Sequence, residues 1–318
     1  MRVRVPLVRG PRCRNGADVI TTHASLDRAS NAAGVAAMLL ACALFVAGDS
    51  CVKLLGQQLP LGEILLLRGV FSLPIVLLMA ARRGLLAQLP AAAANPRLQL
   101  RTALEIGSTI LFLAGLIRMT YADAIAIQQF VPLAVIAGAA LLFGEPVGWR
   151  RWLATFVGLV GVMIVVRPGS GALNWPALMI LANVVCVAGR DLVTRRLGAS
   201  VPTLVVSILS IGAVSLSGLL LAPFETWRIP TGWELFLIAI AGICSTGGFY
   251  WVTEALRRGE AAAVMPFRYA LIPYGVLTGL FIFGEWPDQT TFLGSAIVLG
   301  AGLYALHRER ASSAHGRR

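Results

Sequence analysis

Charged residues are scarce in this sequence. Only 13% of the 318 residues are charged, whereas 57% are hydrophobic and the mean hydropathy is +0.78. A soluble domain carries about 25% charged residues, because water must solvate its surface. The composition therefore excludes a water-soluble domain and predicts an integral membrane protein.

Histidine and cysteine are also scarce. The three histidines, His23, His307 and His315, lie in polar tails, so none is available within an apolar run for a zinc site or a catalytic pair. The cysteine count is five, an odd number, which argues against a disulfide framework. The sequence also has no glycine-rich phosphate loop, which argues against ATP-driven transport by this chain. We expect no cofactor and no metal.

Long apolar runs predict ten transmembrane helices, since a helix needs about 17–25 mostly apolar residues to cross the bilayer. Strands of a membrane barrel would be roughly half as long, with alternating polarity. The predicted spans are Ala32–Leu55, Leu61–Ala81, Leu100–Arg118, Ala122–Phe143, Arg151–Val166, Trp175–Arg195, Pro202–Ala222, Trp233–Leu256, Ala261–Phe283 and Thr290–Leu306.

The net charge of +12 could indicate a nucleic-acid partner, but most basic residues lie in short segments between apolar runs. Nearly all of these arginines fall on one side of the predicted spans, and the opposite side carries Arg118, Arg167 and Arg228. By the positive-inside rule, both termini are cytoplasmic in an inner membrane. Residues 1–31 and 307–318 are then basic cytoplasmic tails, and we expect the first to be disordered; a transit peptide is the alternative for the first.

The two halves of the chain repeat each other. A shift of 142 places Asp49 and Lys53 on Asp191 and Arg195, and a shift of 140 places Phe143-Gly-Glu on Phe283-Gly-Glu. Residues 32–166 and 167–306 therefore form two repeats of five helices. Because five is odd, the second repeat enters the membrane from the opposite side. The sequence predicts an all-α integral membrane protein with ten transmembrane helices in two inverted five-helix repeats.

The repeated Phe143-Gly-Glu-Pro and Phe283-Gly-Glu-Trp turns resemble the EamA family of the drug/metabolite transporter superfamily, and the resemblance covers residues 32–306. Four further motifs are similar to the subgroup that contains S-adenosylmethionine uptake carriers and riboflavin carriers. These motifs are Gly48-Asp-Ser-Cys-Val-Lys53, Trp149-Arg-Arg-Trp-Leu-Ala-Thr155, Pro266-Phe-Arg-Tyr269 and Glu285-Trp-Pro-Asp288. The resemblance implies transport of a polar organic metabolite.

Charges within the spans need a reason, because each costs about 2.5–3.5 kcal/mol at a helix centre on the insertion scale. Asp49 and Lys53 are spaced i,i+4, which predicts a neutral pair on one helix face. The same spacing recurs in Asp191 with Arg195 and in Arg101 with Glu105. Alternatively, a carboxylate releases its partner to bind a proton or a cationic group. Asp49, Glu105 and Asp191, together with Glu63, are therefore candidates for ion coupling.

Arg268 has no acidic residue three or four positions away, and Pro266 and Pro273 flank it. It lies about 10 Å into its span at 1.5 Å per residue. We predict that it binds a solute carboxylate or phosphate; the alternative is an ion pair with Asp49, Asp191 or Glu105. Arg68 is similarly deep, and is either a second anion contact or the partner of a distant carboxylate.

Aromatic and amide side chains complete the predicted site. Planar rings can stack on a heterocycle or hold a cation, and a buried amide needs a hydrogen-bond partner. The candidates are Phe112, Gln128, Phe249, Trp251 and Tyr269.

The sequence thus predicts a secondary transporter that moves a small polar metabolite such as S-adenosylmethionine, riboflavin or an amino-acid-like solute. The alternatives are an amino-acid or drug exporter, a membrane scaffold and a membrane enzyme. The expected partners are the solute and the lipid bilayer. Small-residue faces including Gly158, Gly161 and Gly294 favour close helix packing or a homodimer contact.

Overall fold

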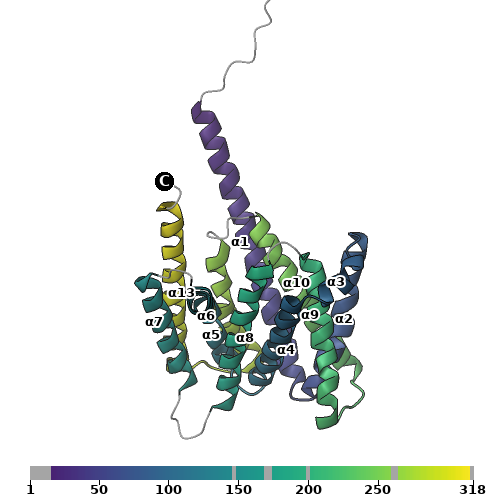
Figure 1. Cartoon of the computed structure of the whole chain (residues 1–318). Coiled ribbons are helices and arrows are strands. Elements are labelled where there is room, and N and C mark those ends of the chain that lie inside the picture. Colours follow the sequence, from purple (N-terminus) through teal and green to yellow (C-terminus); the bar gives the residue numbers. More distant parts are fainter. Residues whose placement is uncertain (1–15, 145–147, 168–173, 198–200, 259–263, 316–318) are drawn as a thin grey trace, which may run out of the picture.

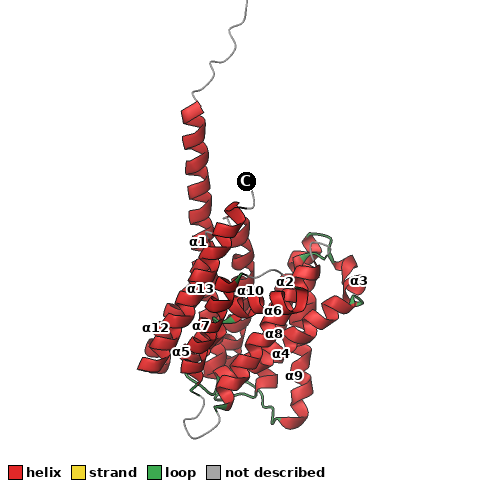
Figure 2. Ribbon diagram, turned by 60° about the vertical axis from the view of Figure 1, so that its left-hand side comes forward, coloured by secondary structure: helices red, strands yellow, loops and turns green. Residues whose placement is uncertain are grey.

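The computed structural model describes residues 16–144, 148–167, 174–197, 201–258 and 264–315, with side chains for all of these except residues 16–30, 151, 195 and 308–315. Within this part of the chain every regular element is a helix (Figures 1 and 2). The elements are α1 (Gly16–Leu55), α2 (Leu61–Arg82), η1 (Leu86–Gln88), α3 (Leu89–Ala93), α4 (Pro96–Leu116), α5 (Tyr121–Gln128), α6 (Val131–Phe143), α7 (Trp149–Val166), α8 (Trp175–Leu197), α9 (Thr203–Leu221), η3 (Ala222–Phe224), α10 (Gly232–Arg258), η4 (Met265–Ala270), α12 (Leu271–Phe283) and α13 (Gln289–His315).

Eight helical segments of the described chain are long and apolar enough to cross a membrane. The two remaining predicted spans correspond to α4 and α7. Helix α4 carries Arg97, Arg101 and Glu105, which lower its hydropathy, and the apolar part of α7, Trp152–Val166, is short. The structure therefore identifies a multi-pass membrane protein.

Local capping explains where α4 begins. The Asn95 side chain accepts a hydrogen bond from the Arg97 backbone N–H at 3.0 Å, and Pro96 occupies the first helical position. Both features favour helix initiation, so α4 begins four residues before the predicted span. Helix α1 begins at Gly16, and its first part extends out of the bundle (Figure 1).

Two membrane segments are broken. Helix α5 ends at Gln128 and α6 starts at Val131, because Pro132 has no N–H to donate to the Gln128 carbonyl. In the second half, the 3-10 segment η4 precedes α12 and has Pro266 at its start. The side-chain amide of Gln129, in the first break, donates a hydrogen bond to the Arg268 carbonyl, in the second break, at 3.3 Å. A polar side chain of one break therefore satisfies a backbone group of the other.

A left-handed glycine ends each segment that precedes a repeated Gly-Glu turn. Gly144 caps α6 with φ +64° and Gly284 caps α12 with φ +65°. A left-handed backbone conformation costs little energy only for glycine, which has no Cβ, and this explains why glycine occurs at both positions.

The most extensive helix packing joins the two halves of the chain: α1 packs on α10, α4 on α8, α2 on α9 and α7 on α13. Two of these contacts are close because glycines face each other, Gly62 with Gly218 and Gly161 with Gly294. Helix α1 begins and α13 ends at the same end of the bundle, whereas α8 begins at the opposite end (Figure 1). The halves are therefore interleaved and share one hydrophobic core.

Candidate functional site

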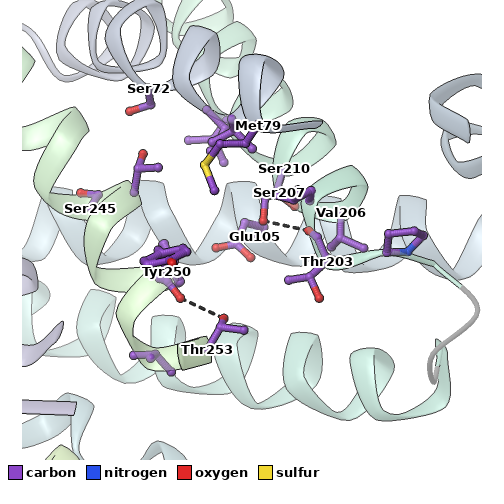
Figure 3. Close-up of a pocket in the computed structure, with 18 of the residues that line it drawn as sticks. Ser72, Met79, Glu105, Thr203, Val206, Ser207, Ser210, Ser245, Tyr250 and Thr253 are labelled. Carbon is purple, nitrogen blue, oxygen red and sulfur yellow. Dashed lines mark hydrogen bonds between the residues drawn. The ribbon is translucent and has the colours of Figure 1, made fainter. Parts of the chain in front are cut away.

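A cavity of about 590 Å³ lies between α2, α4, α8, α9 and α10 (Figure 3). Along α2 it reaches from Leu65 to Arg83, the residue after the helix, which is about 27 Å at 1.5 Å per residue. Arg101 at the start of α4 and Arg257 at the end of α10 also line it. Arg83, Arg101 and Arg257 lie at the end of the bundle where α1 begins and α13 ends, so the cavity opens toward that side.

A network of charged side chains forms one wall of the cavity. Glu105 accepts hydrogen bonds from Arg190 at 2.9 and 3.2 Å and lies 3.4 Å from Arg101. Arg190 also pairs with Asp191 at 2.9 Å. The predicted Arg101–Glu105 pair is confirmed. The structure adds Arg190 as a partner of Asp191, while the side chain of the predicted partner, Arg195, lies outside the described residues.

Arg68 lies at the deep end of the cavity and differs from the other arginines of this wall. Its guanidinium makes no hydrogen bond or ion pair with any residue that the structure describes. The charges of Asp49 and Glu105 act on it from beyond ion-pair distance. A cationic group with five N–H donors is thus available to the cavity.

Hydroxyl groups and apolar side chains together line the remainder of the cavity. The Ser207, Ser245, Thr246 and Thr253 hydroxyls each donate to a backbone carbonyl one helical turn earlier, at 2.8–3.0 Å. Because their protons are used within the helices, their oxygens remain as acceptors for solute N–H or O–H groups. Ser210 accepts from Arg101 at 2.6 Å. Figure 3 shows Ser207 and Ser210 on one side of the space and Ser245, Tyr250 and Thr253 on the other.

Sequence reasoning missed these hydroxyls, because serine and threonine are common in packed spanning helices. Thr203, Ser207 and Ser210 are spaced i, i+4 and i+7, which places them on one face of α9. That stripe of hydroxyl residues in a mostly apolar helix was the available signal.

The predicted site residues divide into two groups. Arg68, Glu105 and Phe249 line the cavity, and Asp49 and Asp191 adjoin it through Arg68 and Arg190. Five other predicted residues do not line it: Arg268, Tyr269, Gln128, Phe112 and Trp251.

The second group lies around η4 and in the core. Tyr269 is 5% exposed, and Phe112 is buried in the main hydrophobic core. The Arg268 carbonyl accepts from Gln129, and Trp251 forms an edge-to-face pair with Tyr250. A solute contact for this group remains a prediction.

At the opposite end of the bundle, Lys53 joins the two halves. Its ammonium donates to Glu285 at 2.5 Å and to the Met119 carbonyl at 2.8 Å. The other Glu285 oxygen accepts from the Tyr121 backbone N–H at 2.7 Å, and the Lys53 ammonium lies 4.7 Å from the centre of the Phe283 ring. The predicted Asp49–Lys53 pair is therefore wrong: Lys53 projects toward the turn after α12, where a carboxylate, a carbonyl and an aromatic face stabilise it together.

Further polar contacts close the same end. Arg167, at the end of α7, pairs with Asp288, and this hydrogen bond is the main reason that the pKa of Asp288 is held well below its usual range. Arg228 pairs with Glu234 at the start of α10, which raises the pKa of Arg228. The described structure is thus open at one end and tied by ion pairs at the other.

A bundle of apolar helices around a cavity that arginines, hydroxyl groups and apolar side chains line is typical of multi-pass membrane transport proteins. The chain belongs to the EamA-like transporter family, which matches residues 32–167 and 174–306.

Two kinds of named relative are similar to the chain. A riboflavin transporter of Rhizobium johnstonii is 34% identical over 200 residues, which cover 62% of this chain and 66%, just under two thirds, of that protein. An S-adenosylmethionine uptake transporter of Rickettsia felis is 24% identical over 287 residues, covering 87% of this chain and 93% of that protein. One solved crystal structure has a similar fold, with a TM-score of 0.60 at 21% identity over 88% of this chain and 97% of that one.

Proposed function

We propose that this EamA-family transporter is a secondary carrier of a small polar organic metabolite and works by alternating access. Its ten spans form two inverted five-helix repeats, and the solute binds in the cavity between them. The observation that carries the proposal is a cavity that is open at one end and closed at the other by ion pairs between the halves.

The pattern of helix packing supports the inverted repeats. Counting α5 with α6 and η4 with α12 as single spans, α1 and α10 are spans one and eight, and α4 and α8 are spans three and six. If each span is replaced by its equivalent in the other repeat, the contact of α1 with α10 becomes the contact of α8 with α4. The contacts of α2 with α9 and of α7 with α13 each join two equivalent spans, so the same exchange leaves them unchanged. Any two-fold axis has this effect, and because the equivalent helices α1 and α8 begin at opposite ends of the bundle, the axis we propose lies in the membrane plane (Figure 1).

The charge distribution supports an inward-open state. Arg83, Arg101 and Arg257 lie at the mouth of the cavity and belong to the arginine-rich side of the predicted topology. By the positive-inside rule that side faces the cytoplasm of an inner membrane, together with both termini. The contacts of Lys53 and Arg167 then close the outer side.

The substrate proposal rests on the cavity lining and on the relatives. Acceptor oxygens and the exposed rings of Phe249 and Tyr250 suit a solute with N–H or O–H donors and a flat ring. The names of the relatives suggest riboflavin, S-adenosylmethionine or an amino-acid-like solute. Asp49, Glu105 and Asp191 remain the proposed coupling groups, and Arg268 remains a proposed solute contact.

Uptake into liposomes tests the proposal. Purified protein should give saturable uptake of at least one solute from a metabolite panel, compared with protein-free liposomes. A Ser207→Trp substitution fills the cavity and should abolish uptake. The control is Val185→Trp, the same introduced side chain at a position of α8 that is 67% exposed on the outer surface. Equal uptake by both variants, or no uptake of any solute, would contradict the proposal.

A further inference from the structure

We propose that Arg68 binds an acidic group, a carboxylate or a phosphate, of the transported solute. The carrier therefore selects acid-bearing metabolites over neutral analogues of the same shape. This inference rests on the proposed function and adds the chemical class of the solute.

The first argument is the position of Arg68. It occupies the eighth position of α2, well inside a spanning helix, and lines the closed end of the cavity. Its stem lies against α10, where a Cβ on Gly242 would approach the Arg68 carbonyl to 2.9 Å and its Cγ to 3.5 Å. The backbone at this residue is therefore fixed by close packing, and the guanidinium is held beside the cavity.

The second argument is that Arg68 has no ion-pair partner among the residues that the structure describes. Three other basic groups of the interior are paired: Arg101 and Arg190 share Glu105, and Lys53 pairs with Glu285. Glu105 already has two arginine partners, so it has little capacity left for Arg68. A guanidinium in a spanning segment without an ion pair is costly. A bound anion would satisfy it through two parallel N–H···O bonds.

The third argument is the charge of the cavity wall. Four arginines line it, Arg68, Arg83, Arg101 and Arg257, against the two carboxylates of Glu105 and Glu254. Glu254 is further neutralised by Arg258 at 2.8 Å. The wall thus has an excess of positive charge, which favours an acidic solute along the whole path to Arg68.

Two pairs of compounds isolate the acidic group. Riboflavin 5′-phosphate differs from riboflavin by a phosphate, and S-adenosylmethionine differs from its decarboxylated form by a carboxylate. We expect the full-length protein in detergent to bind the acid-bearing member of at least one pair about ten- to hundredfold more tightly, as a charge-assisted hydrogen bond allows. Calorimetric titration measures this ratio.

Three variants locate the effect. Arg68→Gln should reduce the ratio to near one, and Arg68→Lys, which keeps the charge but loses the planar fork, should retain part of it. Arg82→Gln removes the same charge from the same helix outside the cavity and should keep the full ratio. Size-exclusion elution identical to wild type shows that each variant is folded.

Equal affinities within both pairs would overturn the proposal, as would an unchanged ratio in Arg68→Gln or failure of both acid-bearing compounds to bind at millimolar concentration. In each of these cases, saturable liposome uptake of a neutral solute would leave the carrier function standing. Loss of all uptake would instead contradict the proposed function itself.

Discussion

At the residue scale, some interior charges pair along one helix, as Arg101 does with Glu105, and others pair across the chain, as Lys53 does with Glu285. Lys53 is 2% exposed, and its carboxylate partner lies 232 positions further on. The i,i+4 spacing of Asp49 and Lys53 predicted a local pair because sequence spacing reports only neighbours on the same helix. The partner of a long, flexible lysine side chain is decided by the tertiary packing that brings another segment within its reach.

The Lys53–Glu285 contact leads to an asymmetric prediction. Glu285→Gln leaves the buried ammonium of Lys53 without its counter-ion, so we expect a loss of about 3–5 kcal/mol of stability. Lys53→Met leaves Glu285, whose side chain is 25% exposed and can be hydrated, and should cost less. Thermal unfolding in detergent compares the two variants. A larger loss for Lys53→Met than for Glu285→Gln would contradict this account of the pair.

The depressed pKa of Asp288 predicts a pH dependence. Arg167, and then the backbone N–H of Thr291 at 3.1 Å, stabilise the ionised carboxylate. A carboxyl with a lowered folded-state pKa contributes stability above its unfolded pKa of about 3.9, and this contribution is lost as the pH falls through the folded value.

Because the pair is half exposed, we expect Asp288→Asn to cost less than about 1 kcal/mol at pH 7. The difference in unfolding temperature between wild type and variant should persist to pH 5 and decrease only below pH 4 or so. A difference that disappears by pH 6 would assign the effect to another group.

At the element scale, the sequence predicted most spans closely. Helix α2 is one residue longer than the predicted span Leu61–Ala81, and α8 is two residues longer than the predicted span Trp175–Arg195. Hydropathy locates such segments because the bilayer requires a minimum apolar length. It did not reveal the break at Gln129, since an apolar run remains apolar whether its helix is continuous or interrupted. Nor did it reveal the cavity, which depends on which faces of five helices meet.

The glycine caps give a prediction at this scale. An L side chain at Gly144 or Gly284 would adopt the left-handed conformation, which costs about 1–2 kcal/mol. An added Cβ meets no atom of the described residues within 4 Å at either position, so the expected cost is conformational. Gly144→Ala and Gly284→Ala should therefore lower stability by similar amounts. The matched control is Gly212→Ala within α9, which also has open space but ordinary helical geometry, and should raise stability by up to about 1 kcal/mol. If neither Gly144→Ala nor Gly284→Ala lowers the stability, these turns can adopt another backbone conformation, and the prediction is wrong.

At the scale of the whole molecule, each major helix contact joins the two halves, so neither half has a closed core of its own. The cavity lies between elements of both halves, and its closed end is tied by contacts between them. A rotation of one half against the other would therefore break the contacts of Lys53 and Arg167 while narrowing the mouth near Arg83 and Arg257. This coupling of the two ends is the mechanical requirement of alternating access.

The proposed inverted arrangement makes a prediction about sidedness. Gln88 follows the second span of the first repeat, and Ile229 lies 141 positions later in the equivalent connection of the second repeat; both side chains are exposed, Ile229 to 92%. Equivalent positions of inverted repeats face opposite sides of the membrane, whereas those of direct repeats face the same side. We expect a membrane-impermeant maleimide to label Ile229→Cys in intact cells, and Gln88→Cys only after permeabilisation, in a background that lacks the five native cysteines. Transport activity of each variant controls for its insertion. If both cysteines react in intact cells, or neither does before permeabilisation, the repeats have the same orientation, and the two-fold exchange on which the carrier mechanism rests is excluded.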